Sequence, residues 1–297
     1  MPDPLLYLQG IVAAVCASAG LTWIVGRRAS LSSPRLSGAG LLSLAGGLLA
    51  GYGALRLMPR WPPVNGLDRF LTIVLPAAVL IEWLASRSGV PRWLAWILRG
   101  GLAVGSGPVL LWSSVYLGES PAAWNPFIAA SILGGSAGAQ IGARCLTGRL
   151  LDRSPGVAVP LLAAVCIQAA GVAVMLAGYL KGGAAAFPIA ASLAAVVLAC
   201  RRRGPELASS IRAALAVAVV GLYGIVLIGR FFGGLSTWSA VVLLMAPAAP
   251  WLVEALPLRS SRPRLAAGLQ VLSTVLALAL VLVPAAIDFM QRSLPLL

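Results

Sequence analysis

The sequence predicts an all-α membrane protein: a polytopic bundle of about ten transmembrane helices that forms one integral membrane domain over residues 1–297. Hydrophobic residues make up 60% of the chain and charged residues only 10%, which leaves too little polar surface to cover a soluble globule. The apolar residues fall into long runs, and the arginines gather in alternate connections between them. These observations together predict the fold class.

Each apolar run of about 17–23 residues can cross the hydrocarbon core as a helix, because about 20 helical residues span its thickness. Only Lys181 and two glycines separate the sixth run from the seventh, which predicts a very tight turn there. The expected spans cover residues 5–25, 38–57, 69–86, 93–115, 124–143, 157–180, 184–200, 210–229, 236–256 and 265–287. All connections are short, so any chemistry is expected between the helices or at their ends.

The distribution of basic residues predicts the orientation of the chain. The net charge of +14 would suggest a nucleic-acid partner in a soluble protein. Here fifteen of the 22 basic residues fall in one set of alternate loops and six in the other, with Arg99 inside a span. Arginine-rich short loops stay in the cytoplasm, so both termini are expected outside it. The expected location is an inner (plasma) membrane. Because the basic residues indicate topology, no nucleic-acid partner is expected.

The preference for arginine over lysine, 21 to one, together with the abundance of alanine, glycine and leucine, indicates a GC-rich bacterial genome.

The sequence contains no motif typical of an enzyme or a metal site. There is no histidine, and none of the four cysteines forms a CxxC pair, so no metal, cofactor or disulfide framework is expected. Cys16 and Cys166 lie in apolar runs and are expected to be buried. No P-loop, GxSxG or paired acidic motif is present, so we do not expect an enzyme.

An internal repeat is suggested by matches at an offset of 171 residues. Tyr52-Gly53 aligns with Tyr223-Gly224, and Pro-Ala-Ala follows 24 residues after each tyrosine. One residue of slippage then aligns Glu82 with Glu254 and Pro91-Arg92 with Pro263-Arg264. The alternative is chance, because apolar sequences align easily.

The repeat would pair spans 1–4 with spans 7–10. Copy one would cover residues 1–115 and copy two residues 181–297, with a two-span insert at residues 116–180. The copies begin an even number of spans apart, so they would run in the same sense and be related by a pseudo-two-fold axis along the membrane normal. Parallel repeats of this kind occur in transporters.

Two matched prolines and two matched glutamates stand out within apolar runs. Pro76 and Pro247 each remove a backbone donor and are expected to kink their helices, although proline in a membrane helix can simply shape the contacts between helices. Because spans 3 and 4 are antiparallel with a short loop, Glu82 is expected to form an ion pair with Arg99.

In the second copy, Gln270 takes the place of the arginine and is expected to contact Glu254, whose pKa would then be raised by desolvation. Such a carboxyl group could carry a proton or bind a cation. The structural alternative is that both glutamates reach the cytoplasmic rim, where water and arginines satisfy them.

The fifth span contains Gly134, Gly138 and Gly142 at four-residue spacing, which predicts a face for close helix contact. Gln140 on the same span could line a passage or form a hydrogen bond across the interface. Glycines with the same spacing at Gly47 and Gly51, and at Gly101 and Gly105, are also expected to serve helix contact.

Two functions fit these features best. The first is a secondary transporter or permease for an unidentified small solute. Its expected binding or coupling site comprises Tyr52, Glu82, Arg99, Tyr223, Glu254 and Gln270. The second is a non-transporting scaffold or complex subunit, in which these polar groups only fix the helices. The expected partners are the lipid bilayer with either a small solute or other membrane subunits. An intramembrane enzyme is a third reading, against which the absence of histidine counts.

Overall fold

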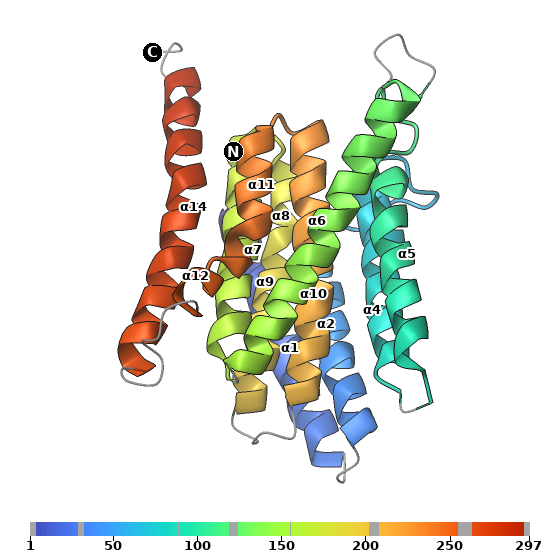
Figure 1. The fold of residues 1–297 in the computed structure, drawn as a ribbon, viewed down its shortest axis with the longest axis vertical. Helices are drawn as coiled ribbons and strands as arrows, with labels where there is room; N and C mark the ends of the chain where they lie inside the picture. Colours follow the sequence, from blue (N-terminus) through green and yellow to red (C-terminus); the bar gives the residue numbers. More distant parts are fainter. Residues whose placement is uncertain are drawn as a thin grey trace.

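The computed structural model describes residues 4–28, 33–87, 89–118, 124–154, 156–201, 208–254 and 263–293. Within these ranges every regular element is a helix, so the all-helical prediction is confirmed (Figure 1). The helices are α1 (Pro4–Arg28), α2 (Ser33–Ala54), α3 (Gly66–Arg69), η1 (Phe70–Val74), α4 (Leu75–Ala85), α5 (Arg92–Leu111), α6 (Pro126–Arg153), α7 (Ala158–Leu176), α8 (Leu180–Ala184), α9 (Ala186–Arg201), α10 (Ala208–Phe232), α11 (Thr237–Met245), η3 (Ala246–Ala248), α12 (Trp251–Glu254) and α14 (Pro263–Ser293).

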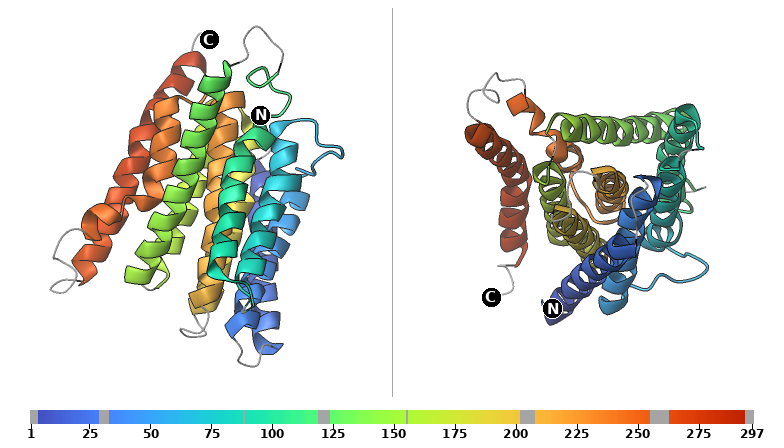
Figure 2. Two further views of the ribbon diagram at one scale, coloured as in Figure 1. Left: turned by 45° about the vertical axis from the view of Figure 1, so that its right-hand side comes forward. Right: turned by 90° about the horizontal axis from the view of Figure 1, so that it is seen from below.

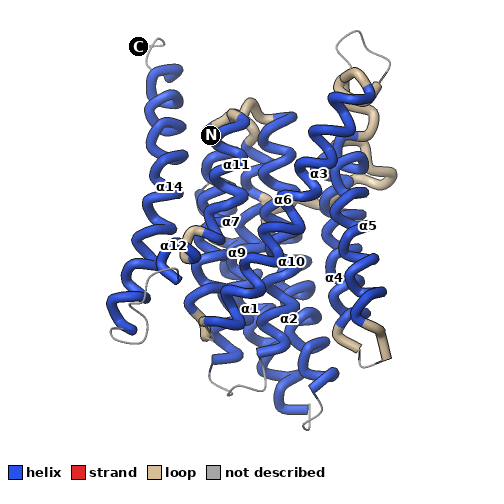
Figure 3. The backbone as a smooth tube through the Cα atoms, in the orientation of Figure 1, coloured by secondary structure: helices blue, strands red, loops and turns tan. Residues whose placement is uncertain are grey.

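The long helices run side by side, with α10 at the centre (Figure 2). Helix α10 contacts α2, α4, α5, α6, α7 and α9, and its apolar stretch Ser210–Phe232 is almost completely buried. Helix α14 lies at the periphery against α7, α11 and α12. Within the described residues, the segments between the helices are loops and turns, drawn in tan in Figure 3. A helix that is apolar all round is buried, which explains the position of α10.

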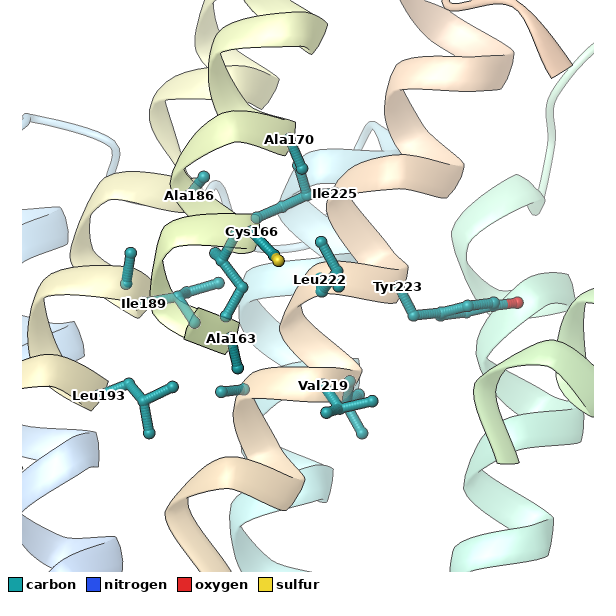
Figure 4. Close-up of a cluster of buried hydrophobic side chains, with 14 of the residues drawn as sticks. Ala163, Cys166, Ala170, Ala186, Ile189, Leu193, Val219, Leu222, Tyr223 and Ile225 are labelled. Atoms are coloured by element: carbon teal, nitrogen blue, oxygen red, sulfur yellow. The ribbon is translucent and has the colours of Figure 1, made fainter. Parts of the chain in front are cut away.

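A cluster of buried hydrophobic side chains lies where α7, α9 and α10 meet (Figure 4). Cys166, Ile189 and Leu222 are buried there among small residues. A side chain at Gly171 would place its Cβ 2.5 Å from the Cβ of Ala186, so glycine lets α7 and α9 approach closely. Tyr223 points away from this cluster, toward the opposite side of α10.

Within the part of the chain that the structure describes, six helices are long and apolar enough to cross a membrane. They are Pro4–Val25, Arg92–Leu111, Ala158–Leu176, Leu180–Arg201, Ser210–Phe232 and Leu265–Arg292. Two shorter apolar helices, Gly38–Ala54 and Thr237–Ala248, match the second and ninth expected spans only in part. The described residues therefore confirm a membrane-compatible helical chain but not ten spans.

The expected spans at 69–86 and 124–143 do not form uninterrupted apolar helices. The segment at 69–86 is divided among α3, the π-helical turn η1 and α4. The segment at 124–143 belongs to α6, which continues to Arg153 through several charged residues. Its 28 residues are long enough to span a bilayer, but their second half is polar.

Both prolines lie at a departure from regular α-helix. Pro76 lies in the first turn of α4, directly after η1, where the N–H of Leu75 bonds to the carbonyl oxygen of Phe70. Pro247 lies in the 3-10 helix η3, which separates α11 from α12. The prolines differ in setting, because Pro76 is exposed and Pro247 is buried.

The four cysteines are free thiols. Cys166 is buried, as expected, because it lies on α7 inside the bundle. The expectation of burial is wrong for Cys16, which is exposed on α1, a helix whose main neighbours are α2 and α9.

The two halves of the expected repeat occupy different places in the bundle. The repeat would make α14 the counterpart of α5. Helix α5 contacts the central helix α10, whereas α14 lies at the edge of the bundle against α7 and α11. This arrangement does not confirm the repeat.

Chain direction places one set of helix ends together. Helices α4, α6 and α9 finish, and α5, α7 and α10 begin, at the lower end of the bundle in Figure 1. We call this the arginine end, because its helix ends carry Arg87, Arg92, Arg153, Arg201 and Arg212. Helix α1 begins and α14 ends toward the opposite end (Figure 1).

Substitution of Gly47 tests the close contact of α1, α2 and α9. A Cβ at Gly47 would lie 1.8 Å from Oγ of Ser18 and 2.5 Å from Oγ of Ser192, and both serines are fully buried. We expect Gly47→Ala to destabilise the protein by about 1–3 kcal/mol through overpacking. A lower melting temperature in detergent micelles checks this.

The matched control is Gly138→Ala, because a Cβ at Gly138 would have no atom within 4 Å. Alanine there should be neutral or stabilising, since glycine inside a helix costs roughly 0.5–1 kcal/mol relative to alanine. Equal melting temperatures for the two variants would contradict the described contact.

Candidate functional site

The carboxylate of Glu82 is the centre of a buried charge cluster near the arginine end. Glu82 is only 4% exposed and lies in the last turn of α4. Nε of Arg99 donates to Oε1 at 3.1 Å, and Nη2 donates to Oε2 at 2.9 Å, so the pair is bidentate. The predicted ion pair between Glu82 and Arg99 is therefore confirmed. It forms because α5 follows α4 closely in the sequence and runs antiparallel to it.

A second arginine completes the cluster. Nη2 of Arg144, on α6, lies 2.6 Å from Oε1 of Glu82. The side chains of Arg144 and Arg99 are 15% and 20% exposed. One carboxylate therefore holds two largely buried guanidinium groups from two different helices.

The expected span at 124–143 and the count of loop arginines place Arg144 in a cytoplasmic loop, and this expectation is wrong, because Arg144 lies within α6. Helix α6 continues for nine residues beyond Arg144 and ends at Arg153, which carries Arg144 about 13 Å into the bundle by helical rise. The signal was present in the sequence, because no proline interrupts residues 127–153.

A second ion pair lies nearer the rim. Arg212 of α10 pairs with Asp152 of α6, through two nitrogens of the guanidinium group. Their side chains are 56% and 50% exposed, so this pair is in contact with water, unlike Glu82.

These charged residues line a pocket of about 400 Å³ between α4, α5, α6 and α10. Four arginines and two carboxylates face it: Arg99, Arg144, Arg149, Arg212, Glu82 and Asp152. Small residues, among them Ala85, Gly148 and Ala213, supply much of the remaining wall and leave space for a solute. The pocket is therefore cationic, and it lies close to the arginine end.

Trp96 stands beside the buried cluster. Its ring is 5.5 Å from the guanidinium carbon of Arg99, and its side chain is 47% exposed. A flat aromatic surface and an arginine thus share one side of the pocket.

Glu254 forms a separate polar cluster. Its Oε1 accepts hydrogen bonds from Nε2 of Gln270 at 2.9 Å and from Oγ of Ser154 at 2.6 Å. The predicted contact with Gln270 is confirmed. These residues join α12, α14 and the end of α6, and none of them lines the pocket around Glu82.

The two matched tyrosines also lie outside the pocket. The hydroxyl of Tyr52 donates to the carbonyl oxygen of Ala185 at 3.1 Å, which ties α2 to the beginning of α9. The hydroxyl of Tyr223 lies 3.0 Å from Oγ of Ser136 on α6. Of the six residues expected to form one site, the structure brings only Glu82 and Arg99 together in the pocket.

The glycine face of α6 is not used for contact within the chain. A Cβ at Gly134, Gly138 or Gly142 would have no atom within 4 Å, and the same holds at Gly101 and Gly105 of α5. The expectation of close contact is wrong for these positions, although it is confirmed at Gly47 and Gly51.

The contact between α5 and α6 uses a different face of α6. Gln140 is buried on that face and accepts a hydrogen bond from Oγ of Ser106 at 3.2 Å. Ala137 and Ala143 are buried near it, one helical turn to either side. The hydrogen bond across the interface that we expected of Gln140 is therefore present, while the glycines face outward.

A second pocket of about 360 Å³ lies between α7, α11 and α14, away from the charge cluster. Asp288 and Arg292 are the charged residues in its lining. Among the residues that the structure describes, no group of three or more His, Cys, Asp or Glu side chains could hold a metal ion.

Comparison with known protein families, with curated proteins and with solved structures finds no match to this chain.

Replacing Glu82 tests its role as the counter-charge of both arginines. In Glu82→Gln, two neighbouring buried guanidinium groups lose their shared carboxylate, and removal of one partner of a buried ion pair costs about 3–5 kcal/mol. We expect a clearly lower melting temperature in detergent micelles. The double variant Glu82→Gln/Arg144→Gln should recover part of the loss, because one uncompensated charge is removed.

Asp152→Asn is the control, since it removes a carboxylate from an exposed pair, which contributes about 0–1 kcal/mol. A Glu82→Gln variant as stable as Asp152→Asn would contradict the described cluster.

Proposed function

We propose that this protein is a permease of a bacterial inner membrane that binds a small solute in the pocket around Glu82. In this proposal the chain crosses the bilayer ten times, the arginine end faces the cytoplasm, and both termini lie outside it. The observation that carries the proposal is the buried cluster of Glu82, Arg99 and Arg144 on the wall of a solute-sized pocket. Ionisable groups within membrane helices are costly and commonly mark solute pathways.

The distribution of helix ends and tryptophans supports the proposed orientation. The chain passes between the two ends of the bundle at each long helix, and divided segments at 66–85 and 237–254 complete two of the passes. Exposed tryptophans lie near the helix ends, where an aromatic belt is expected at a bilayer interface. They include Trp23 and Trp93 toward the arginine end, and Trp61, Trp112 and Trp238 toward the other.

Equivalent polar contacts support the proposed repeat of residues 1–115 and 181–297. Glu82 contacts Arg99 of the following helix, and Glu254 contacts Gln270 of the helix that follows it. The two pairs are separated by 17 and 16 residues. In the second copy, the amide of Gln270 stands in place of the guanidinium group of Arg99. This difference would leave one charged solute pocket rather than two.

The geometry suggests how the pocket would receive a solute. The Arg212–Asp152 pair lies at the rim in contact with water, and the Glu82 cluster lies deeper and is largely dry. A polar solute would therefore first meet the exposed charges of this pair and then the buried charges of the Glu82 cluster. Because Glu82 holds Arg99 and Arg144 in place, little side-chain ordering would be needed on binding.

A role as a membrane subunit is the second candidate, and the outward-facing glycines favour it. Gly134, Gly135 and Gly138 of α6, with Gly101 and Gly105 of α5, have open space above them. Small residues on a lipid-facing surface let another transmembrane helix approach closely. In that role the charged cluster would only fix α4, α5 and α6.

Uptake by proteoliposomes distinguishes the two functions. We expect the wild type to accumulate at least one solute from a radiolabelled panel of glucose 6-phosphate, succinate, alanine and glucose, above the level in empty liposomes. Glu82→Gln should reduce that uptake at least tenfold, because the pocket loses its organising carboxylate. Arg92→Gln is the control, since Arg92 lies at the same end but does not line the pocket.

Glu254→Gln tests the proton-coupling hypothesis in the same assay. Loss of uptake driven by a pH gradient, with solute exchange retained, would support a proton-carrying role for Glu254. No uptake of any panel solute by the wild type would contradict the permease and favour the subunit.

A further inference from the structure

The charges that line the Glu82 pocket do not balance. Glu82 carries one negative charge, and the Arg99 and Arg144 side chains that it contacts carry two positive charges. All three groups are largely buried, so water screens this excess poorly. Excess charge within a membrane protein is costly unless a counter-charge is bound.

A second excess charge lies nearer the rim of the same pocket. Arg212 is matched by Asp152, but Arg149, which also lines the pocket, makes no ion pair within the described part of the chain. The lining therefore carries two more positive than negative charges, one at the buried cluster and one toward water. A solute with two negative charges would neutralise both.

The chemistry of the lining favours phosphate within the class of dianions. Guanidinium groups bind phosphate through two parallel N–H···O bonds. A phosphate monoester carries close to two negative charges at pH 7, because its second pKa is about 6.

The pocket also has room and surface for an organic group. Its volume of about 400 Å³ lies within the usual range for small-molecule sites. Trp96, Leu215 and Ala216 supply apolar wall that inorganic phosphate alone would leave uncovered.

We propose that this pocket binds a phosphate monoester, with the phosphate group held by Arg149 and Arg212 together with the Glu82-bound arginines. The inference rests on the proposed solute pocket and names the class of its substrate. The monoester could be a soluble metabolite or the headgroup of phosphatidic acid, since both present the same doubly charged phosphate.

In this proposal Asp152 competes with the ligand for Arg212. Asp152 holds the guanidinium group while the pocket is empty, and the phosphate takes its place on binding. Removal of this carboxylate frees one arginine and adds one positive charge to the pocket. Asp152→Asn should therefore strengthen binding, whereas a purely structural ion pair would make the variant bind no better than the wild type.

Binding of glucose 6-phosphate to the purified full-length protein in lipid-free detergent, measured by isothermal titration calorimetry at low salt, tests the proposal. We expect saturable binding by the wild type and none of glucose. Arg149→Gln and Arg212→Gln should each weaken binding about tenfold or more, and Asp152→Asn should tighten it several-fold. Arg92→Gln, outside the pocket, should bind as the wild type does.

A second arm separates the two sources of the phosphate. In nanodiscs of phosphatidylcholine with phosphatidic acid, a lipid ligand would compete with glucose 6-phosphate and weaken its apparent binding, relative to nanodiscs of phosphatidylcholine alone. Equal binding in the two kinds of nanodisc indicates a soluble monoester.

The proposal is overturned if glucose 6-phosphate does not bind in the detergent arm, if succinate binds as tightly, or if the Arg149 and Arg212 variants bind as the wild type does. Binding does not depend on transport, so its failure can be told apart from failure of the permease. Binding without uptake supports the phosphate site and contradicts the permease. If the protein takes up a neutral solute, if this uptake requires Glu82, and if glucose 6-phosphate does not bind, the permease is supported and the phosphate site is contradicted.

Discussion

The carboxylate of Glu82 is the interaction on which the pocket depends. It joins Arg99 of α5 to Arg144 of α6, and Glu82 itself is buried in the last turn of α4. One largely buried carboxylate thereby joins three helices. A single carboxylate between two guanidinium groups also leaves the cluster positive, so the ion pairs that order the helices also leave the excess charge on which the proposed anion site rests.

Small residues and the central helix make room for this cluster. Helix α10 is apolar along nearly its whole length, and α2, α7 and α9 pack closely on it through glycine and alanine. On its other side, α4, α5 and α6 stand around the charged groups, and Ala213 and Ala216 of α10 leave space there. The bundle is thus dry and tightly packed on one side of α10 and polar on the other.

Much of this arrangement could be predicted from the sequence, because hydropathy and helical spacing act locally. The all-helical class, the Glu82–Arg99 pair and the Glu254–Gln270 contact follow from apolar runs joined by short turns. Arg144 was missed because hydropathy ended the fifth span before it, although the helix continues. The glycine spacing of α6 predicted close helix contact, but no described atom lies within 4 Å of a Cβ at Gly134, Gly138 or Gly142, because spacing alone does not determine which face of a helix its neighbours contact. Tyr52 and Tyr223 align in the expected repeat, yet they bond to different elements, because tertiary contacts decide their partners.

Reactivity of Cys145 tests most directly whether a water-accessible, cationic pocket surrounds the Glu82 cluster. Cys145 lines the pocket and is partly exposed, whereas Cys166 and Cys200 are buried and Cys16 lies outside it. The measurement is the labelling rate of a variant that keeps only Cys145, with a negatively and a positively charged methanethiosulfonate reagent. Each rate is divided by that of the same reagent with free 2-mercaptoethanol. The account predicts a higher normalised rate for the anionic reagent, with a difference that shrinks in Arg149→Gln. No labelling, or a higher normalised rate for the cationic reagent, would contradict it.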